Sequence, residues 1–149
     1  MKPSCLYLAI YLMILWVQPR RYLSWLPTIP LYPSNTEEVQ VVRRWMARRQ
    51  PSQEALFYHT DPSIVYAFQE HVSESIVELQ GIISRVHVLL LILGSKLLFN
   101  RARPAQIDPH LRPLESETAQ TPAYPSGHAF QAYYLAEVLA ERYPEKTTL

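Results

Sequence analysis

The residues best suited to chemistry are Ser126, Gly127 and His128, which follow Pro125 in the stretch TPAYPSGHAF. The sequence after them predicts a helix, so these residues would lie at its N-terminus. A helix N-terminus presents unpaired N–H groups and a partial positive charge, both of which suit a phosphate. Glycine lets the backbone approach an anion, and a serine hydroxyl can bond to a phosphate oxygen or simply cap the helix. The stretch therefore indicates either an anion site or an ordinary cap.

Three basic side chains could extend such a site. His128, in the first helical turn, could donate a proton to the group that leaves a bound phosphate. Lys96 and Arg103 are seven residues apart, which would put them on one stripe of a continuous helix. Lysine offers a point charge and arginine a planar fork for oxyanions. Lone histidines are usually structural and basic helix ends are common, so neither segment is decisive alone.

Together, the two segments resemble the first two signature motifs of the type-2 phosphatidic acid phosphatase and vanadium haloperoxidase superfamily, which also contains soluble acid phosphatases. The motifs are Lys96-x6-Arg103-Pro104 and Pro125-Ser126-Gly127-His128, matched without substitution and in the family's order. The resembling region covers residues 96–145, about a third of the chain. The resemblance implies that phosphate oxygens are held by Lys96, Arg103, Ser126 and the Gly127 amide, and that His128 is the general acid.

The family's third motif, Ser-Arg-x5-His-x3-Asp, supplies the histidine nucleophile, and nothing after His128 matches it. The earlier stretch SRVH, at residues 84–87, fails because Leu91 and Ser95 stand where the histidine and aspartate should be. Oxyanion contacts without a nucleophile could bind phosphate but would turn it over poorly. We therefore expect a phosphatase-like chain that is inactive, or incomplete at its C-terminus.

The resemblance implies a phosphatase that hydrolyses lipid or soluble phosphate monoesters through a phosphohistidine. Two alternatives stay open: a non-catalytic module that binds phosphate or phospholipid headgroups, and a haloperoxidase in which vanadate occupies the same pocket. Apart from that vanadate, no cofactor is expected. One cysteine and five scattered histidines form no four-ligand zinc pattern, so no metal site is expected.

Composition limits the partners. The 149 residues suffice for one domain with a core, and 48% of them are apolar while 18% are charged. A formal net charge of +1 predicts no strong attraction to nucleic acid. The expected partner is a phosphate-ester substrate, and the composition does not indicate an oligomeric state.

The N-terminal segment 1–26 contains a continuous apolar run, CLYLAIYLMILWV, at residues 5–17. It is shorter than the roughly 20 residues that span a bilayer, and no clear small-x-small cleavage site follows it. A signal peptide, a short membrane anchor and a buried first helix all remain open. Membrane contact through residues 5–17, or export, is favoured over a plain cytoplasmic location. Residues 27–149 are assigned to a partial phosphatase-like helical domain.

Strand-like alternation is scarce, so we predict an all-α fold, a helical bundle of the acid phosphatase and haloperoxidase type. Helix signals such as Asn35, Pro62 and Gly81 predict four helices and a proline-rich loop. The helices are expected at about 35–50, 61–80, 82–102 and 126–142, and the loop at 104–125. A bundle that lacks helices would expose an apolar face, so poor solubility or self-association is expected.

Overall fold

The computed structural model describes residues 21–26 and 34–146 of the chain. The apolar run at residues 5–17, with its three alternative roles, lies outside the described residues, as does the proline-containing stretch 27–33. Within the described residues the protein is helical and has no strand, only an isolated antiparallel bridge between Arg21 and Arg101. The all-α prediction is confirmed at that level.

Seven α-helices and three short 3-10 segments make up the described fold. The α-helices are α2 (Asn35–Met46), α3 (Pro51–Thr60), α4 (Val65–Phe68), α5 (Ile76–Ile83), α6 (Val86–Phe99), α7 (Pro104–Ile107) and α8 (Gly127–Ala140). The 3-10 segments are η1 (Gln69–His71), η2 (Glu117–Gln120) and η3 (Pro144–Lys146).

The predicted helix boundaries hold at some positions and fail at others. The first helix begins at Asn35 as expected but ends at Met46 rather than near Gln50. Gln50 has an extended backbone, as favoured before a proline, and Pro51 starts α3. The last predicted helix corresponds closely to α8. The predicted loop 104–125 is wrong in part, since it contains α7 and η2.

The predicted helix over 61–80 is wrong, because Val72 and Ser75 have extended backbones that separate η1 from α5. Ser75 and Glu78 form a reciprocal capping box, which starts α5 at Ile76. Gly81 was expected to end a helix but lies inside α5. The predicted helix over 82–102 is likewise divided, since α5 ends at Ile83 and α6 ends at Phe99.

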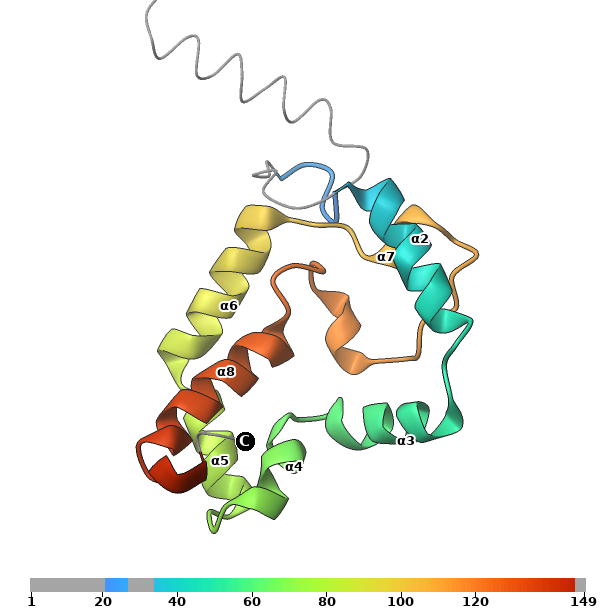
Figure 1. Cartoon of the computed structure of the whole chain (residues 1–149). Coiled ribbons are helices and arrows are strands. Elements are labelled where there is room, and N and C mark those ends of the chain that lie inside the picture. Colours follow the sequence, from blue (N-terminus) through green and yellow to red (C-terminus); the bar gives the residue numbers. More distant parts are fainter. Residues whose placement is uncertain (1–20, 27–33, 147–149) are drawn as a thin grey trace, which may run out of the picture.

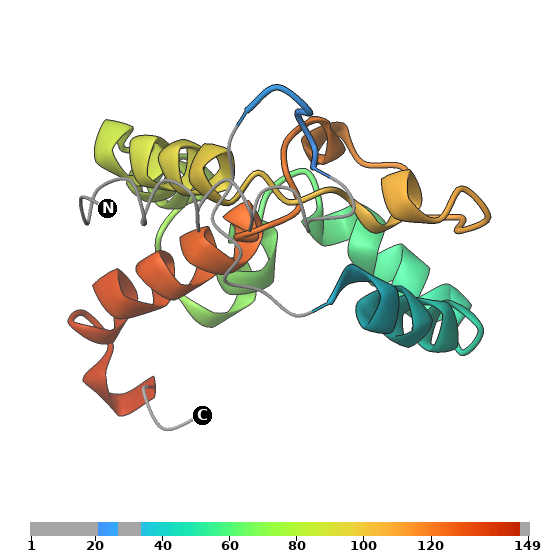
Figure 2. The ribbon, with the colours of Figure 1, turned by 90° about the horizontal axis from the view of Figure 1, so that it is seen from above.

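The main core lies where α4, α5 and α8 meet. Leu79 and Leu135 are fully buried there, and Phe68, Tyr134 and Tyr143 cover the edges. In Figure 1, α6 runs beside α8 on one side of the molecule, while α2 and α3 lie on the other. In the same view α7 lies beside α2, while η2 and the chain that leads into α8 lie between the two sides. Figure 2 shows the separation of the two sides from above, with α7 and η2 at the edge of the molecule.

Two ion pairs hold α2 to the region after α6. Arg43 of α2 bonds the buried carboxylate of Asp108, with a nitrogen–oxygen distance of 2.6 Å. Arg101 bonds Glu38 of the same helix. The hydrogen bond from Arg43 lowers the pKa of Asp108. These two pairs attach the chain on both sides of α7 to α2.

Asn100 ends α6 and holds residues 22–26 in place. Its backbone is left-handed, with φ of 45°, and its N–H donates to the Lys96 carbonyl at 2.8 Å. Its fully buried side chain accepts from the Leu23 N–H at 2.9 Å and donates to the carbonyls of Leu23 and Leu26. One residue therefore combines a helix stop with a long-range clamp.

No single helix among the described residues is long and apolar enough to cross a membrane. The pair α5 and α6, bent by 52°, meets the length and composition requirement only when both are taken together.

We predict that Asn100→Ala lowers the free energy of unfolding by about 3 kcal/mol, because it orphans buried backbone groups and strains a left-handed position. Asn100→Gly is the matched control: it relieves the strain but not the lost hydrogen bonds, so it should be about 1 kcal/mol less harmful. Urea denaturation measures both variants. Equal losses below about 0.5 kcal/mol would contradict the clamp.

Candidate functional site

One cavity of about 730 Å³ is lined by all five residues that the sequence singled out. Lys96 enters it from α6, and Arg103 from the residue that precedes α7. Ser126, Gly127 and His128 enter it from the N-terminus of α8. Residues that are distant in sequence are therefore brought together by the packing of α6 against α8 and by the segment between α7 and α8.

Lys96 is buried, with only 6% of its surface exposed. It lies on the inner face of α6 with Ile92 and Val88, four and eight residues before it, which are the other buried residues of that helix. Its ammonium donates to the Pro122 carbonyl at 2.6 Å. Burial, with a smaller effect from the nearby charge of Arg103, lowers the pKa of Lys96 to about 8. Lys96 is thus a desolvated cation inside the cavity.

Arg103 reaches the cavity by a different route from the one predicted. It does not share a helical stripe with Lys96, because α6 ends at Phe99 and Arg103 is the extended residue that precedes Pro104 and α7. Its guanidinium donates to the Thr121 carbonyl at 2.9 Å and to the Thr118 carbonyl at 3.1 Å. Burial is the main cause that lowers the pKa of Arg103.

The N-terminus of α8 is capped as the sequence allowed. Ser126 is the cap, and its hydroxyl oxygen accepts from the Ala129 N–H at 3.2 Å. An added Cβ on Gly127 would lie 3.5 Å from Ile92 and 3.7 Å from the Lys96 side chain, which are ordinary contacts. The helix itself therefore does not require glycine here. Gly127 does bring the start of α8 directly against Lys96.

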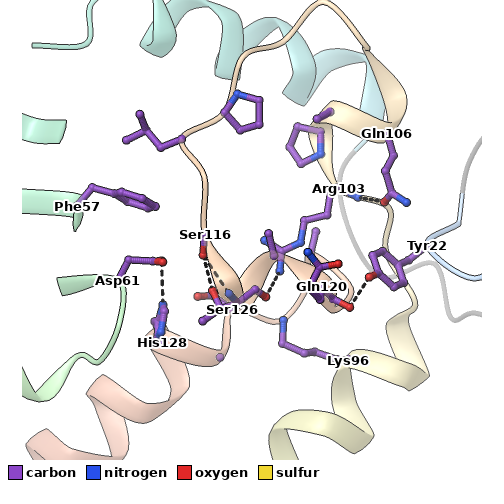
Figure 3. A pocket seen from close by; sticks show the side chains of 18 of the residues that line it. Tyr22, Phe57, Asp61, Lys96, Arg103, Gln106, Ser116, Gln120, Ser126 and His128 are labelled. Atoms are coloured by element: carbon purple, nitrogen blue, oxygen red, sulfur yellow. Dashed lines mark hydrogen bonds and ion pairs between the residues drawn. The ribbon is translucent and has the colours of Figure 1, made fainter. Parts of the chain in front are cut away.

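His128 faces Asp61, a residue that the sequence analysis assigned only to a helix start. Its Nδ1 lies 3.9 Å from a carboxylate oxygen of Asp61, and Figure 3 shows the two side chains directed toward each other. Asp61 follows the last turn of α3, and its side chain is 15% exposed. The contact depends on how α3 packs near α8, which no local sequence signal predicts. This distance is longer than a hydrogen bond, so Asp61 and His128 are paired only by charge, and only when the imidazole is protonated.

The cavity is electrostatically positive at one end. Within residues 21–26 and 34–146, no carboxylate lies within ion-pair distance of Lys96 or Arg103. Their hydrogen-bond partners are instead neutral carbonyls of Thr118, Thr121 and Pro122. The partial positive charge of the α8 N-terminus adds to the two cations. Tyr22 closes another side by donating its hydroxyl to the Gln120 carbonyl, which Figure 3 also shows. Such a site can bind an oxyanion and supply a proton beside it.

The other histidines are not among the residues that line this cavity. His59 packs against Tyr66, and His87 of the SRVH stretch bonds the Tyr134 hydroxyl at 3.1 Å. The described part of the chain also contains no cluster of three or more histidine, cysteine or acidic residues that could hold a metal ion. His128 is therefore the histidine around which any chemistry in the described cavity must be considered.

Comparison with known proteins adds no relative: no family model matches the sequence, and no curated protein or solved structure matches it.

The buried charge of Lys96 predicts a specific dependence of stability on pH. Its folded-state pKa of about 8 lies below the ordinary 10.5, so the unfolded chain binds more protons between these values. The contribution of Lys96 to the free energy of unfolding is therefore lowest below pH 8 and rises as the pH increases toward 10.5. We expect wild type to gain stability relative to Lys96→Met between pH 7 and pH 10 in urea denaturation.

The control for this measurement is Lys146→Met, which removes an exposed lysine outside the cavity, bonded to the His71 carbonyl. A difference between wild type and Lys96→Met that stays constant or falls with rising pH would show that Lys96 is not a desolvated cation.

Proposed function

We propose that the cavity binds the phosphate group of a phosphate monoester and that His128 supplies the proton to the leaving alcohol. In this proposal the chain contributes a helical domain of the type-2 phosphatidic acid phosphatase and haloperoxidase kind. The observation that carries it is the convergence of Lys96, Arg103 and the α8 N-terminus, with His128, on one cavity.

The binding step follows from the charges. A phosphate at the α8 N-terminus would accept from the Ser126 hydroxyl and the Gly127 amide. Lys96 has three N–H donors and uses one for the Pro122 carbonyl, so its remaining donors can turn to an anion. Arg103 offers a planar fork of donors. An incoming phosphate dianion would replace neutral carbonyls as the partner of Lys96 and Arg103. The attraction between opposite full charges is stronger in a desolvated cavity than in water.

The proton-transfer step involves His128 and Asp61. With Asp61 near Nδ1, the imidazole can hold its Nε2 toward the ester oxygen that leaves. The attacking group is a separate requirement. In the resembling family it is the histidine of a third motif, which this sequence does not contain. The chain as given therefore carries the binding and proton-donating half of a phosphoryl-transfer site.

We predict that inorganic phosphate binds the chain at low ionic strength, and that Arg103→Ala and Lys96→Met each weaken binding by about tenfold or more. Loss of a charged hydrogen-bond donor is worth about 1.5–3 kcal/mol, which sets that scale. Isothermal titration calorimetry measures the affinities. The matched control is Arg112→Ala, because Arg112 is an exposed residue of the same segment and does not line the cavity. Equal effects of Arg103→Ala and Arg112→Ala would contradict the proposal.

A substrate test separates binding from turnover. Phenyl phosphate should compete with inorganic phosphate for the cavity, while phenol release by this chain should be slow because the nucleophile motif is missing. If phenol is released rapidly, His128→Ala should reduce the rate at least about a hundredfold, as expected for a general acid. The control is His110→Ala, an exposed histidine outside the cavity. Rapid hydrolysis that persists unchanged in His128→Ala would place the reaction elsewhere.

A further inference from the structure

The outer face of α6 is unusually apolar for a surface. Val86, Leu90, Leu93 and Leu97 form a stripe along it, spaced four, three and four residues apart. Their exposed fractions are 72%, 64%, 48% and 39%. Leu89, Leu91 and Leu98 flank the stripe and are also exposed. A continuous apolar stripe of this length on a helix indicates a surface that packs against another element.

This stripe is separate from the face that builds the cavity. Val88, Ile92 and Lys96 are the buried residues of α6, and Ile92 and Lys96 line the cavity. The flanking Leu89 also lines the cavity, but none of the four residues of the stripe does. An added Cβ on Gly94 would have no neighbour within 4 Å, so the middle of α6 is open on that side. A small residue there allows the backbone of a partner helix to approach closely. Figure 1 shows α6 at the edge of the molecule, with α8 on its inner side.

Arg21, where the described part of the chain begins, lies at the C-terminal end of α6 and so at one end of this stripe. Arg21 pairs with Arg101, two residues beyond the end of α6. The Tyr22 N–H donates to the Asn100 carbonyl at 3.1 Å, and the Asn100 side chain clamps Leu23 and Leu26. Arg21 and Tyr22 are thus held at the C-terminal end of α6.

We propose that the apolar residues 5–17 pack along the outer face of α6, parallel to it, with Val17 near Leu97 and Cys5 near Val86. Both segments then have their C-terminal ends at the Asn100 clamp. The proposal assigns one of the three roles left open by the sequence, that of a buried first helix, to a defined surface. The inference does not depend on the phosphate site.

The lengths agree with this pairing. Residues 5–17 are thirteen in number and would span about 20 Å as a helix. The fourteen residues of α6 span about 21 Å. In the proposed pairing residues 18–20 would have to reverse the chain, because the bridge between Arg21 and Arg101 is antiparallel, and Pro19 suits a turn. A three-residue connection is within the usual range between packed helices.

The tether favours this occupant over the two others that an apolar face could attract. A segment joined by three residues has an effective concentration in the millimolar range, far above that of a second copy in dilute solution. A bilayer is less suited, because neither residues 5–17 nor α6 alone reaches the roughly 20 residues of a span. The two short apolar segments match each other better than either matches a membrane.

Cys5 is the only cysteine in the sequence, so it provides a built-in probe. A disulfide needs Cα atoms within about 7 Å. In the full chain under mild oxidation, Val86→Cys should form an intramolecular disulfide with Cys5, and Leu97→Cys should not. A second set of variants starts from a chain that carries both Cys5→Ser and Val17→Cys. In this background we expect the opposite preference: Leu97→Cys should form a disulfide with the cysteine at position 17, and Val86→Cys should not. Mass spectrometry of the non-reduced protein identifies each bond.

Three outcomes would overturn the proposal. The first is no intramolecular disulfide in either set. The second is disulfides only between chains, which would assign the face to a second copy. The third is co-sedimentation with phosphatidylcholine vesicles together with loss of the intramolecular disulfides, which would assign it to a bilayer.

Hydrogen exchange provides a test that does not depend on cysteine substitutions. Leu90→Asp puts a charge in the middle of the stripe and should accelerate amide exchange in residues 5–17 at least about tenfold, while α8 keeps its protection. The matched control is Val77→Asp, at a residue of α5 that is 81% exposed and outside the stripe. Unchanged exchange in Leu90→Asp, or equal acceleration in both variants, would overturn the pairing.

Discussion

The burial of the Lys96 ammonium beside Arg103 and the N-terminus of α8 is the constraint on which the cavity depends. Three sources of positive charge meet there, and the described partners of the two cations are neutral carbonyls. Dipoles compensate a desolvated cation only in part, which is why the pKa of Lys96 falls to about 8. A protein that only needed a stable core would favour an apolar side chain at this position. The buried cation therefore lowers the stability of the fold, and a bound anion, as in the proposed function, would offset this cost.

The rest of the fold can be understood as the support that this charge cluster requires. The core of α4, α5 and α8 gives the N-terminus of α8 a rigid base. Packing of α6 against α8 then brings Lys96 to Gly127. Asn100 stops α6 one turn beyond Lys96, so the chain turns away and Arg103 can return from a separate segment. The Arg43–Asp108 and Arg101–Glu38 pairs fix that segment to α2.

The sequence allowed the residues of the cavity to be proposed but not the path by which they meet. Lys96, Arg103 and His128 were found through motif spacing, and all three line the cavity. The common stripe predicted for Lys96 and Arg103 was wrong, because a left-handed Asn100 interrupts the helix between them. The two residues therefore line one cavity without sharing a helix. The number of residues between Lys96 and Arg103 does not show that the helix ends between them.

The other features that the sequence analysis missed have causes of two kinds, one local and one long-range. The capping box of Ser75 and Glu78 and the proline at position 51 were readable signals, and weighing them would have placed the starts of α5 and α3 correctly. Asp61 is different, because its meeting with His128 depends on how α3 packs near α8. Long-range packing also decides that Asn100 clamps residues 23 and 26. Local signals specify where helices begin and end, whereas the partners of polar side chains are decided by the tertiary fold.

The backbone carbonyls in the cavity suggest how it would respond to a ligand. Thr118, Thr121 and Pro122 belong to the segment between α7 and α8, and their carbonyls accept hydrogen bonds from Arg103 and Lys96. The Thr118 carbonyl also accepts from the Thr121 hydroxyl at 3.4 Å. A phosphate that takes over the donors of Arg103 and Lys96 would release part of the segment's attachment, so binding and the position of the segment are coupled. A shift of this segment would also move Ser116 and Gln120, which belong to it and line the cavity. The shape of the cavity on that side would therefore change when the ligand binds. Selectivity among phosphate esters would on this basis arise from the segment that the cations now hold, because the phosphate itself is common to every candidate substrate.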